Sequence, residues 1–171
     1  MQINEDTKRM VVKIGTSTLI HKTGKTNIRR IAKLASVLSD LQNAGKEIIL
    51  VSSGTVGVGV GRLGLKKCPE TTRAKQALAA VGQCEMMFLY DKLFSEYGHT
   101  VAQLLLTKSD VEDETRCENL VNTFDQLFEY GVIPVVNENG SVTADGLSFD
   151  HHDMLPAIVA DLVDADEIIT M

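Results

Sequence analysis

Four consecutive apolar residues, followed at once by hydroxyls and a glycine, constrain the fold of this chain more than any other feature. The apolar run extends from Ile48 to Val51, and Ser52, Ser53 and Gly54 follow it directly. A continuous apolar run of this length is typical of a strand that is covered on both faces, as in a parallel sheet. We therefore expect small hydroxyls and bare backbone N–H groups at the carboxyl end of a buried strand, where open α/β sheets bind their ligands.

A second segment near the amino terminus has the same order of residues. Residues 10–14 predict a short buried strand that contains Lys13, and Gly15 and Thr16 follow it. A lysine beside a glycine turn places a compact positive charge next to backbone donors, which suits phosphoryl transfer because that reaction needs charge neutralised by positioned groups. An ordinary strand–loop–helix junction with a solvated lysine explains this segment equally well on its own. Two such junctions in one chain favour an anion site.

Strand and helix patterns alternate along the whole chain. Apolar residues at helical spacing, a candidate N-cap at Asn27 and a terminating glycine at Gly45 predict a helix over 27–44. The same reasoning predicts strands at 47–51, 101–106, 132–136 and 167–171, a short helix through the glycines after Gly54, and helices at 71–97, 113–130 and 153–163. Such alternation is typical of an α/β protein, here a three-layer α/β/α sandwich with a mainly parallel sheet.

Two residues within these elements carry specific expectations. Gly82 marks the place where we expect a break in the helix 71–97. Pro134 cannot donate to a strand ladder, so it predicts either that the strand 132–136 lies at the edge of the sheet or that the proline stands at a strand start.

Composition excludes several classes of protein. The chain has 171 residues, enough for one domain with a real core, and a formal net charge of -6. It has no basic run and no aromatic ladder, so we expect no nucleic-acid partner. No apolar stretch of transmembrane length and no signal peptide is apparent, so we expect no membrane partner and a cytoplasmic protein. Cys68, Cys84 and Cys117 form no C-x-x-C motif and are interpreted as reduced thiols.

Two motifs in the chain resemble known sites only superficially. The segment Gly59–Gly64 fits the dinucleotide pattern G-x-G-x-x-G, but it begins several residues after the strand that ends at Val51 and is followed by a helical segment. Close packing of a helix against a neighbour is the favoured interpretation. His151 and His152 are adjacent, and adjacent side chains diverge on a strand or a helix, so we predict no metal site there.

Two polar features leave alternatives open. Asp153 fits a helix N-cap, and it also fits a carboxylate aimed at a ligand at the helix start. The segment 137–140 follows a predicted strand, and its amides suit either a turn or the binding of a polar substrate. The polar stretch 137–150 as a whole is expected to form a hairpin-like connection.

Several segments, in this order, resemble the glutamate 5-kinases of the amino-acid kinase family, which has a carbamate kinase-like fold. They are residues 11–17, 50–56, 75–83, 103–107 and 132–139. The resemblance implies phosphorylation of the γ-carboxylate of L-glutamate by ATP with Mg²⁺, the first step of proline biosynthesis. It also implies a homo-oligomer and possible feedback by proline.

The resemblance assigns roles to eight residues of this chain. Two are implied to be catalytic, two to bind phosphate and four to bind the substrate. In that order they are Lys13 and Asp153; Gly15 and Thr16; and Ser53, Gly54, Asn137 and His152.

The chain departs from the family pattern at two places. Gly140 stands where the family has an aspartate, and the segment 150–153 reads Asp-His-His-Asp where the family has Gly-Asp-Asn-Asp. The family also continues beyond this point with most of its nucleotide site. We therefore expect residues 1–171 to be the amino-terminal substrate-binding lobe without the nucleotide lobe, a fragment or truncated product. The alternative is a truncated, non-catalytic homologue that binds an amino acid or only oligomerises.

Overall fold

The structure, a computed structural model, describes residues 6–21, 24–143 and 154–171. Five parallel strands form one sheet in the order β3-β4-β2-β1-β5. In chain order the strands are β1 (Arg9–Ile14), β2 (Glu47–Ser52), β3 (Val101–Leu106), β4 (Ile133–Glu138) and β5 (Glu167–Thr170). The helices are α1 (Thr16–Leu19), α2 (Ile28–Asn43), α3 (Thr55–Arg62), α4 (Thr72–Ser95), α5 (Lys108–Glu112), α6 (Glu114–Glu129) and α7 (Met154–Leu162).

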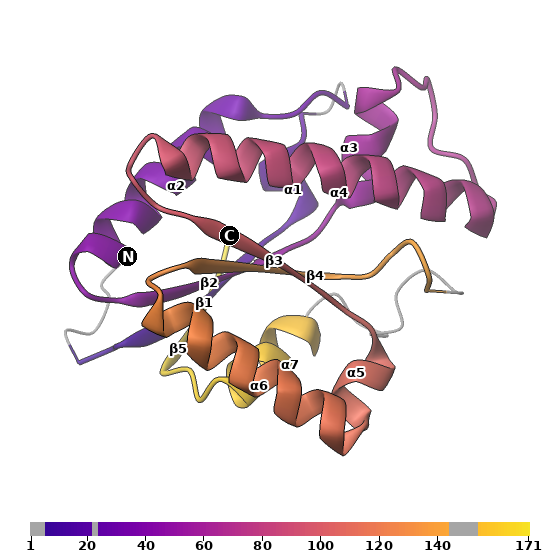
Figure 1. Cartoon of the computed structure of the whole chain (residues 1–171). Helices are drawn as coiled ribbons and strands as arrows, with labels where there is room; N and C mark the ends of the chain where they lie inside the picture. Colours follow the sequence, from indigo (N-terminus) through magenta and orange to yellow (C-terminus); the bar gives the residue numbers. More distant parts are fainter. Residues whose placement is uncertain (1–5, 22–23, 144–153) are drawn as a thin grey trace.

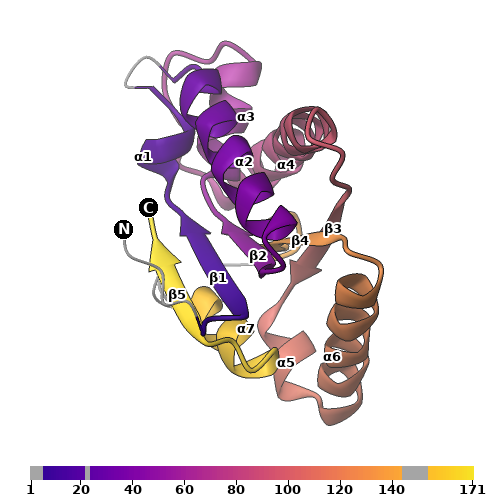
Figure 2. The same ribbon diagram turned by 90° about the vertical axis from the view of Figure 1, so that its left-hand side faces the viewer.

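Helices cover both faces of this sheet. Helices α2, α3 and α4 lie on one side, and α6 and α7 lie on the other, as Figures 1 and 2 show. The expected three-layer α/β/α sandwich with a parallel sheet is therefore confirmed.

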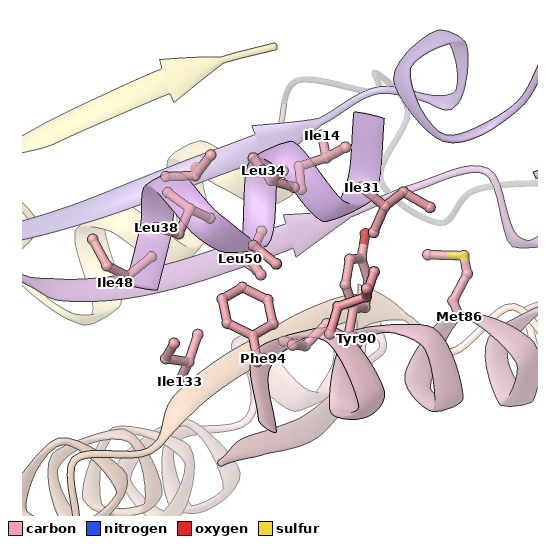
Figure 3. Close-up of a cluster of buried hydrophobic side chains, with 14 of the residues drawn as sticks. Ile14, Ile31, Leu34, Leu38, Ile48, Leu50, Met86, Tyr90, Phe94 and Ile133 are labelled. Carbon is pink, nitrogen blue, oxygen red and sulfur yellow. The ribbon is translucent and has the colours of Figure 1, made fainter. Parts of the chain in front are cut away.

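The buried core consists of two clusters, one on each side of the sheet. Successive side chains of a strand point to opposite faces, so Val12 of β1 belongs to the cluster under α2 and α4, whereas Val11 belongs to the cluster under α6 and α7. Figure 3 shows the first cluster, in which Tyr90 and Phe94 of α4 face the strand residues Leu50 and Ile133. This two-sided burial is the reason that the strands are continuous apolar runs.

Helix α4 is unbroken at Gly82, so the expected break in this helix is wrong. A glycine is required here for a steric reason, because a Cβ atom at this position would lie 1.8 Å from the carbonyl oxygen of Thr55. Gly82 therefore allows the backbones of α4 and α3 to approach each other closely.

Pro134 does not lie in an edge strand, because β4 is placed between β3 and β2. The alternative expectation, a proline at a strand start, agrees with the structure. Pro134 is the second residue of β4, and the pairing of β4 with β2 begins one residue later, at Val135. The missing N–H group therefore precedes the part of β4 that is paired on both sides.

The chain between β3 and α6 contains a short helix, α5, that the sequence patterns did not predict. The predicted helix that follows it is confirmed as α6, with Asp113 as its N-cap. At the other end of the sheet, β5 lies at the edge beside β1. The last part of the predicted hairpin-like connection, residues 144–150, lies outside the described residues.

Candidate active site

The ends of β1 and β2 are tied together at the carboxyl edge of the sheet. Ser53 follows β2, and both its backbone N–H and its hydroxyl donate to the carbonyl oxygen of Ile14, at 3.2 and 3.0 Å. Gly54 comes next with a φ of +90°, which favours glycine, and is the N-cap of α3. We call the segments that follow β1 and β2, residues 15–16 and 53–54, the two loops of the cavity. A Cβ atom on Gly54 would lie 2.7 Å from the hydroxyl oxygen of Thr16, so these two loops are in direct contact.

The amino terminus of helix α3 lies next to these loops. The backbone N–H groups of Thr55, Val56 and Gly57 form its first turn, where N–H groups have no partner within the helix. The helix dipole adds a partial positive charge at the same end. This terminus is therefore suited to bind a carboxylate or a phosphate.

Glycines set the position of α3. A Cβ atom on Gly59 would lie 2.1 Å from the carbonyl oxygen of Leu78 in α4, and one on Gly61 would lie 2.0 Å from the carbonyl oxygen of Gly24. The interpretation of Gly59–Gly64 as a close-packing segment is confirmed at these two glycines.

A cavity of about 620 Å³ opens where the loops, α3, α4 and the end of β4 converge. Its volume suits a small-molecule ligand. The lining residues are Thr16, Ser53, Gly54, Thr55, Val56, Gly57, Thr72, Lys75, Gln76, Ala79, Asn137, Glu138, Gly140 and Thr143.

Asn137 enters this cavity from the carboxyl end of β4 and is only 5% exposed. Its Nδ2 donates to Oε1 of Gln83 at 2.9 Å, and its Oδ1 accepts the backbone N–H of Glu138 at 2.9 Å. Nε2 of Gln83 in turn donates to Oε1 of Gln103, also at 2.9 Å. The amide of Asn137 is therefore held at both of its polar atoms.

A second cavity, of about 460 Å³, is lined by Gln83 and Gln103 among other residues. It shares Thr55, Ala79, Glu138 and Gly140 with the first cavity. A Cβ atom on Gly140 would lie 3.0 Å from the Cβ of Ala79, so a side chain at position 140 would press on the wall of α4.

Four of the sequence-predicted site residues meet in the first cavity, namely Thr16, Ser53, Gly54 and Asn137. The other predicted residues within the described part of the chain are Lys13 and Gly15, and neither is among those that line this cavity.

Lys13 and Gly15 lie beside the cavity at the end of β1. Lys13 is partly buried in β1, between Val51 of β2 and Thr170 of β5. The backbone N–H of Gly15 donates to the carbonyl oxygen of Met171 at 3.0 Å. Their roles toward phosphate stay predictions, as do those of His152 and Asp153, which lie outside the described residues.

Sequence reasoning missed the contribution of α4. Thr72, Lys75, Gln76 and Ala79 line the first cavity, and Gln76 ties the far side of the cavity because its Nε2 donates to the carbonyl oxygen of Thr143 at 2.7 Å. The available signal was their spacing of three or four residues, which places them on one face of a helix.

A buried hydrogen bond supports the end of β2 from below. The hydroxyl groups of Tyr90 and Ser52 lie 2.8 Å apart, and both residues are buried. Burial raises the pKa of Tyr90 to about 12, although the hydrogen bond with Ser52 acts in the opposite direction. Since Ser52 directly precedes Ser53, the hydrogen bond between Ser52 and Tyr90 stabilises the end of β2 from which the loop begins.

The described ranges of the chain contain no group of three or more His, Cys, Asp or Glu side chains arranged to hold a metal ion. They also contain no helix that is long and apolar enough to span a bilayer. The three cysteines are unpaired by disulfides.

Comparison with known proteins identifies relatives over nearly the whole chain. Similar proteins include the glutamate 5-kinase of Clostridium perfringens (strain 13 / Type A), which is 54% identical over 171 residues, covering 98% of this chain and 64% of that protein. The glutamate 5-kinase of Moorella thermoacetica is 51% identical over 159 residues, covering 93% and 42%. That of Listeria innocua is 48% identical over 171 residues, covering 98% and 62%.

The chain thus spans between 42% and 64% of the length of these relatives. The model of the amino acid kinase family matches residues 8–171, which include the entire sheet and both loops of the cavity. On that match, the chain belongs to the amino acid kinase family.

Proposed function

We propose that this chain provides the substrate-binding part of a glutamate 5-kinase, which transfers a phosphoryl group from ATP to the γ-carboxylate of L-glutamate. One observation carries the proposal: hydroxyls, a helix amino terminus and a fixed amide converge on one cavity at the carboxyl edge of a parallel sheet. The names of the similar proteins support the same substrate.

The chemistry of this reaction suits such a cavity. A carboxylate is ionised at neutral pH and is already a nucleophile, so the enzyme needs no strong general base. Catalysis then depends on holding the reactants in line and on neutralising the charge of the transferring group. The cavity supplies hydrogen-bond donors, which are the groups required to hold a dicarboxylic amino acid.

Each donor is suited to a different part of glutamate. The N–H groups at the start of α3 suit a carboxylate, because the helix dipole also favours negative charge there. The second hydrogen of Asn137 Nδ2 is a further donor, since its first is used by Gln83. Ser53 donates its hydroxyl hydrogen to Ile14, so its oxygen remains an acceptor that suits the ammonium group.

The phosphoryl side of the reaction is proposed to involve residues at the end of β1 together with Asp153. We propose that Lys13 neutralises the transferring phosphoryl group and that Gly15 and Thr16 lie beside the phosphates. We also propose that Asp153 organises the catalytic groups and that His152 binds the substrate. These roles come from the family resemblance.

Magnesium usually keeps several waters and is held by substrate phosphates with one or two carboxylates. The donor set fits that mode better than an ion caged by protein alone, since the described lining of the cavity offers one carboxylate, Glu138. Bound there, the ion would supply charge neutralisation at the phosphate oxygens.

Calorimetric titration of the 171-residue chain with L-glutamate tests the proposal. We expect saturable binding that L-glutamine does not reproduce, because the γ-carboxylate is the recognised group. Asn137→Asp places a negative charge in the cavity and is expected to weaken binding at least tenfold. Asn122→Asp, on the exposed face of α6, is the matched control. Absence of glutamate binding by the folded wild-type chain would overturn the proposal.

A second assay distinguishes catalysis from binding alone. ATP-dependent formation of γ-glutamyl hydroxamate in the presence of hydroxylamine reports phosphoryl transfer to glutamate. Because residues 1–171 are expected to lack the nucleotide lobe, we expect saturable glutamate binding with little or no hydroxamate, and rapid hydroxamate formation by this chain would contradict that expectation.

A further inference from the structure

Three side-chain amides from three different elements form a continuous hydrogen-bonded chain into the cavity. Asn137 belongs to β4, Gln83 to α4 and Gln103 to the neighbouring strand β3. We propose that Gln83 is a positioning residue for Asn137, and that Gln103 fixes the orientation in which Gln83 acts. We refer to these three residues as the amide relay.

The backbone sets the direction of the amide relay. The N–H group of Glu138 is only a donor, so it requires the oxygen of Asn137 on its side. The nitrogen of Asn137 then faces Gln83, which must present its own oxygen and turn its nitrogen toward the oxygen of Gln103. Reversal of any one amide would place two donors or two acceptors against each other.

The burial of the amide relay decreases outward from the site. Asn137 is 5% exposed, Gln83 is partly buried and Gln103 is exposed on the sheet. Hydrogen bonds in a buried environment polarise one another when donors and acceptors follow in one direction. A buried amide that loses a partner is destabilised, because the unpaired group remains out of contact with water. Asn137 therefore depends on Gln83 more than Gln83 depends on Gln103.

The consequence for the ligand rests on the proposed function. Gln83 and Gln103 line the second cavity and are absent from the described lining of the first. Neither therefore needs to touch glutamate to influence its binding. The amide relay acts by keeping the second hydrogen of Asn137 Nδ2 aimed into the first cavity.

Substitution of the outermost residue tests the amide relay without disturbing the core. Gln103→Leu removes the acceptor for Gln83, whereas Gln103→Glu keeps an acceptor of nearly the same shape. Gln83→Leu removes the partner of Asn137 directly. Gln126→Leu removes an exposed glutamine amide on α6 that bonds Glu129, and it serves as the control.

Nuclear magnetic resonance of the side-chain amide groups gives the primary readout. We expect the Asn137 NH₂ resonances to move and their exchange with water to accelerate about 3- to 10-fold in Gln83→Leu, the factor of a lost hydrogen bond. A smaller change in the same direction is expected in Gln103→Leu. Gln103→Glu and Gln126→Leu should leave these resonances as in the wild type.

The dissociation constant for L-glutamate is the second readout. It should rise several-fold in Gln83→Leu and Gln103→Leu and return toward the wild-type value in Gln103→Glu. Unchanged Asn137 resonances in both leucine variants would overturn the amide relay, and so would a Gln103→Glu variant that behaves like Gln103→Leu. If the wild-type chain binds no glutamate, the proposed function fails, whereas the resonances still decide on the amide relay.

Discussion

Gly54 and Thr16 lie so close together that a single added carbon would separate the two loops of the cavity. A Cβ atom on Gly54 would lie 2.7 Å from the hydroxyl oxygen of Thr16 and 3.0 Å from its methyl carbon. The backbone of Gly54 has a φ of +90°, a conformation that other residues adopt at a cost of about 1–2 kcal/mol. The contact and the conformation together explain why a glycine is needed at this point.

We therefore expect Gly54→Ala to damage both stability and ligand binding. The free energy of unfolding should fall by about 1–2 kcal/mol from the backbone conformation, with a further loss from the displacement of Thr16. Binding of L-glutamate should weaken more than tenfold because the α3 terminus and Thr16 move apart. Urea unfolding and calorimetric titration measure the two effects.

Gly64→Ala is the matched control for this substitution. Gly64 also has a positive φ, of +65°, but nothing lies within 4 Å of an added Cβ atom. The variant should lose a similar amount of stability from the backbone alone and keep the wild-type affinity for L-glutamate. Equal loss of affinity in both variants would contradict a specific role for the Gly54–Thr16 contact.

The glycine of α4 gives a second prediction about close packing. Gly82→Ala places a Cβ atom 1.8 Å from the carbonyl oxygen of Thr55, and backbone atoms cannot move aside as a side-chain end can. We expect the free energy of unfolding to fall by about 3 kcal/mol, the upper range for overpacking. Chemical denaturation measures this loss. A free energy of unfolding equal to that of the wild type would show that α3 and α4 can move apart at little cost.

Gly57→Ala is the comparison for that variant. Its added Cβ atom would lie 2.7 Å from Cδ1 of Ile20, the flexible end of a side chain. Alanine also favours a helix over glycine by about 1 kcal/mol. Little net change in stability is therefore expected for Gly57→Ala, although both substitutions are made at helical glycines.

The elements of this fold could be predicted from the sequence because their signals are local. Apolar runs such as Ile48–Val51 and helical spacing as in 27–44 depend only on neighbouring residues. The role of Gly82 could not be predicted, because a glycine looks the same in a helix break and in a close approach of two backbones. Pro134 was ambiguous for a similar reason, since the strand order depends on crossovers that local patterns do not specify.

The same distinction applies to the candidate site. Thr16, Ser53 and Gly54 were predicted together because the carboxyl ends of parallel strands meet at one edge of the sheet. The residues of α4 were missed, since the face that a long helix turns toward the cavity depends on its packing. Gln83 illustrates this, because its contacts with Asn137 and Gln103 distinguish it from other helix glutamines and follow only from the packing.

The buried pair of Tyr90 and Ser52 leads to a third prediction. Tyr90→Phe and Ser52→Ala should each lower the free energy of unfolding by about 1–3 kcal/mol, because each leaves one buried hydroxyl without its partner. The double variant removes both hydroxyls, so it should be less destabilised than the sum of the two. A double-mutant cycle measures this coupling, and strictly additive losses would contradict it. Tyr130→Phe, at a tyrosine that is 72% exposed, is the control.

The raised pKa of Tyr90 adds a dependence on pH. Because the pKa is raised from 10.0 to about 12 in the folded protein, the unfolded chain releases this proton first. The corresponding stability is present below about pH 10 and is lost as the pH rises toward 12. Between these values the wild type should lose more stability than Tyr90→Phe, which has no proton to release. Parallel slopes of stability against pH would show that Tyr90 does not titrate in this way.

Asp110 provides the last prediction, at the start of α5. Its carboxylate accepts the hydroxyl of Thr107 at 2.6 Å and the backbone N–H of Thr107 at 2.8 Å, and it also pairs with Arg116 at 2.8 Å. These contacts, those of Thr107 first, lower the pKa of Asp110 below its ordinary value of 3.8. Asp110→Asn should lower the free energy of unfolding at pH 7 by about 1 kcal/mol, as for the loss of a helix cap.

The sign of the pKa shift determines how this difference between Asp110→Asn and the wild type varies with pH. A carboxyl whose pKa is lowered by folding stabilises the protein above its unfolded pKa, and that stability is lost as the pH falls through the folded pKa. The gap in stability should therefore be full at pH 7 and narrow steadily below about pH 4. Asp125→Asn, at an exposed position of α6, is the control and should show no such gap. A gap in Asp110→Asn that stays constant down to pH 2 would assign the loss to packing and not to the charge of the carboxylate.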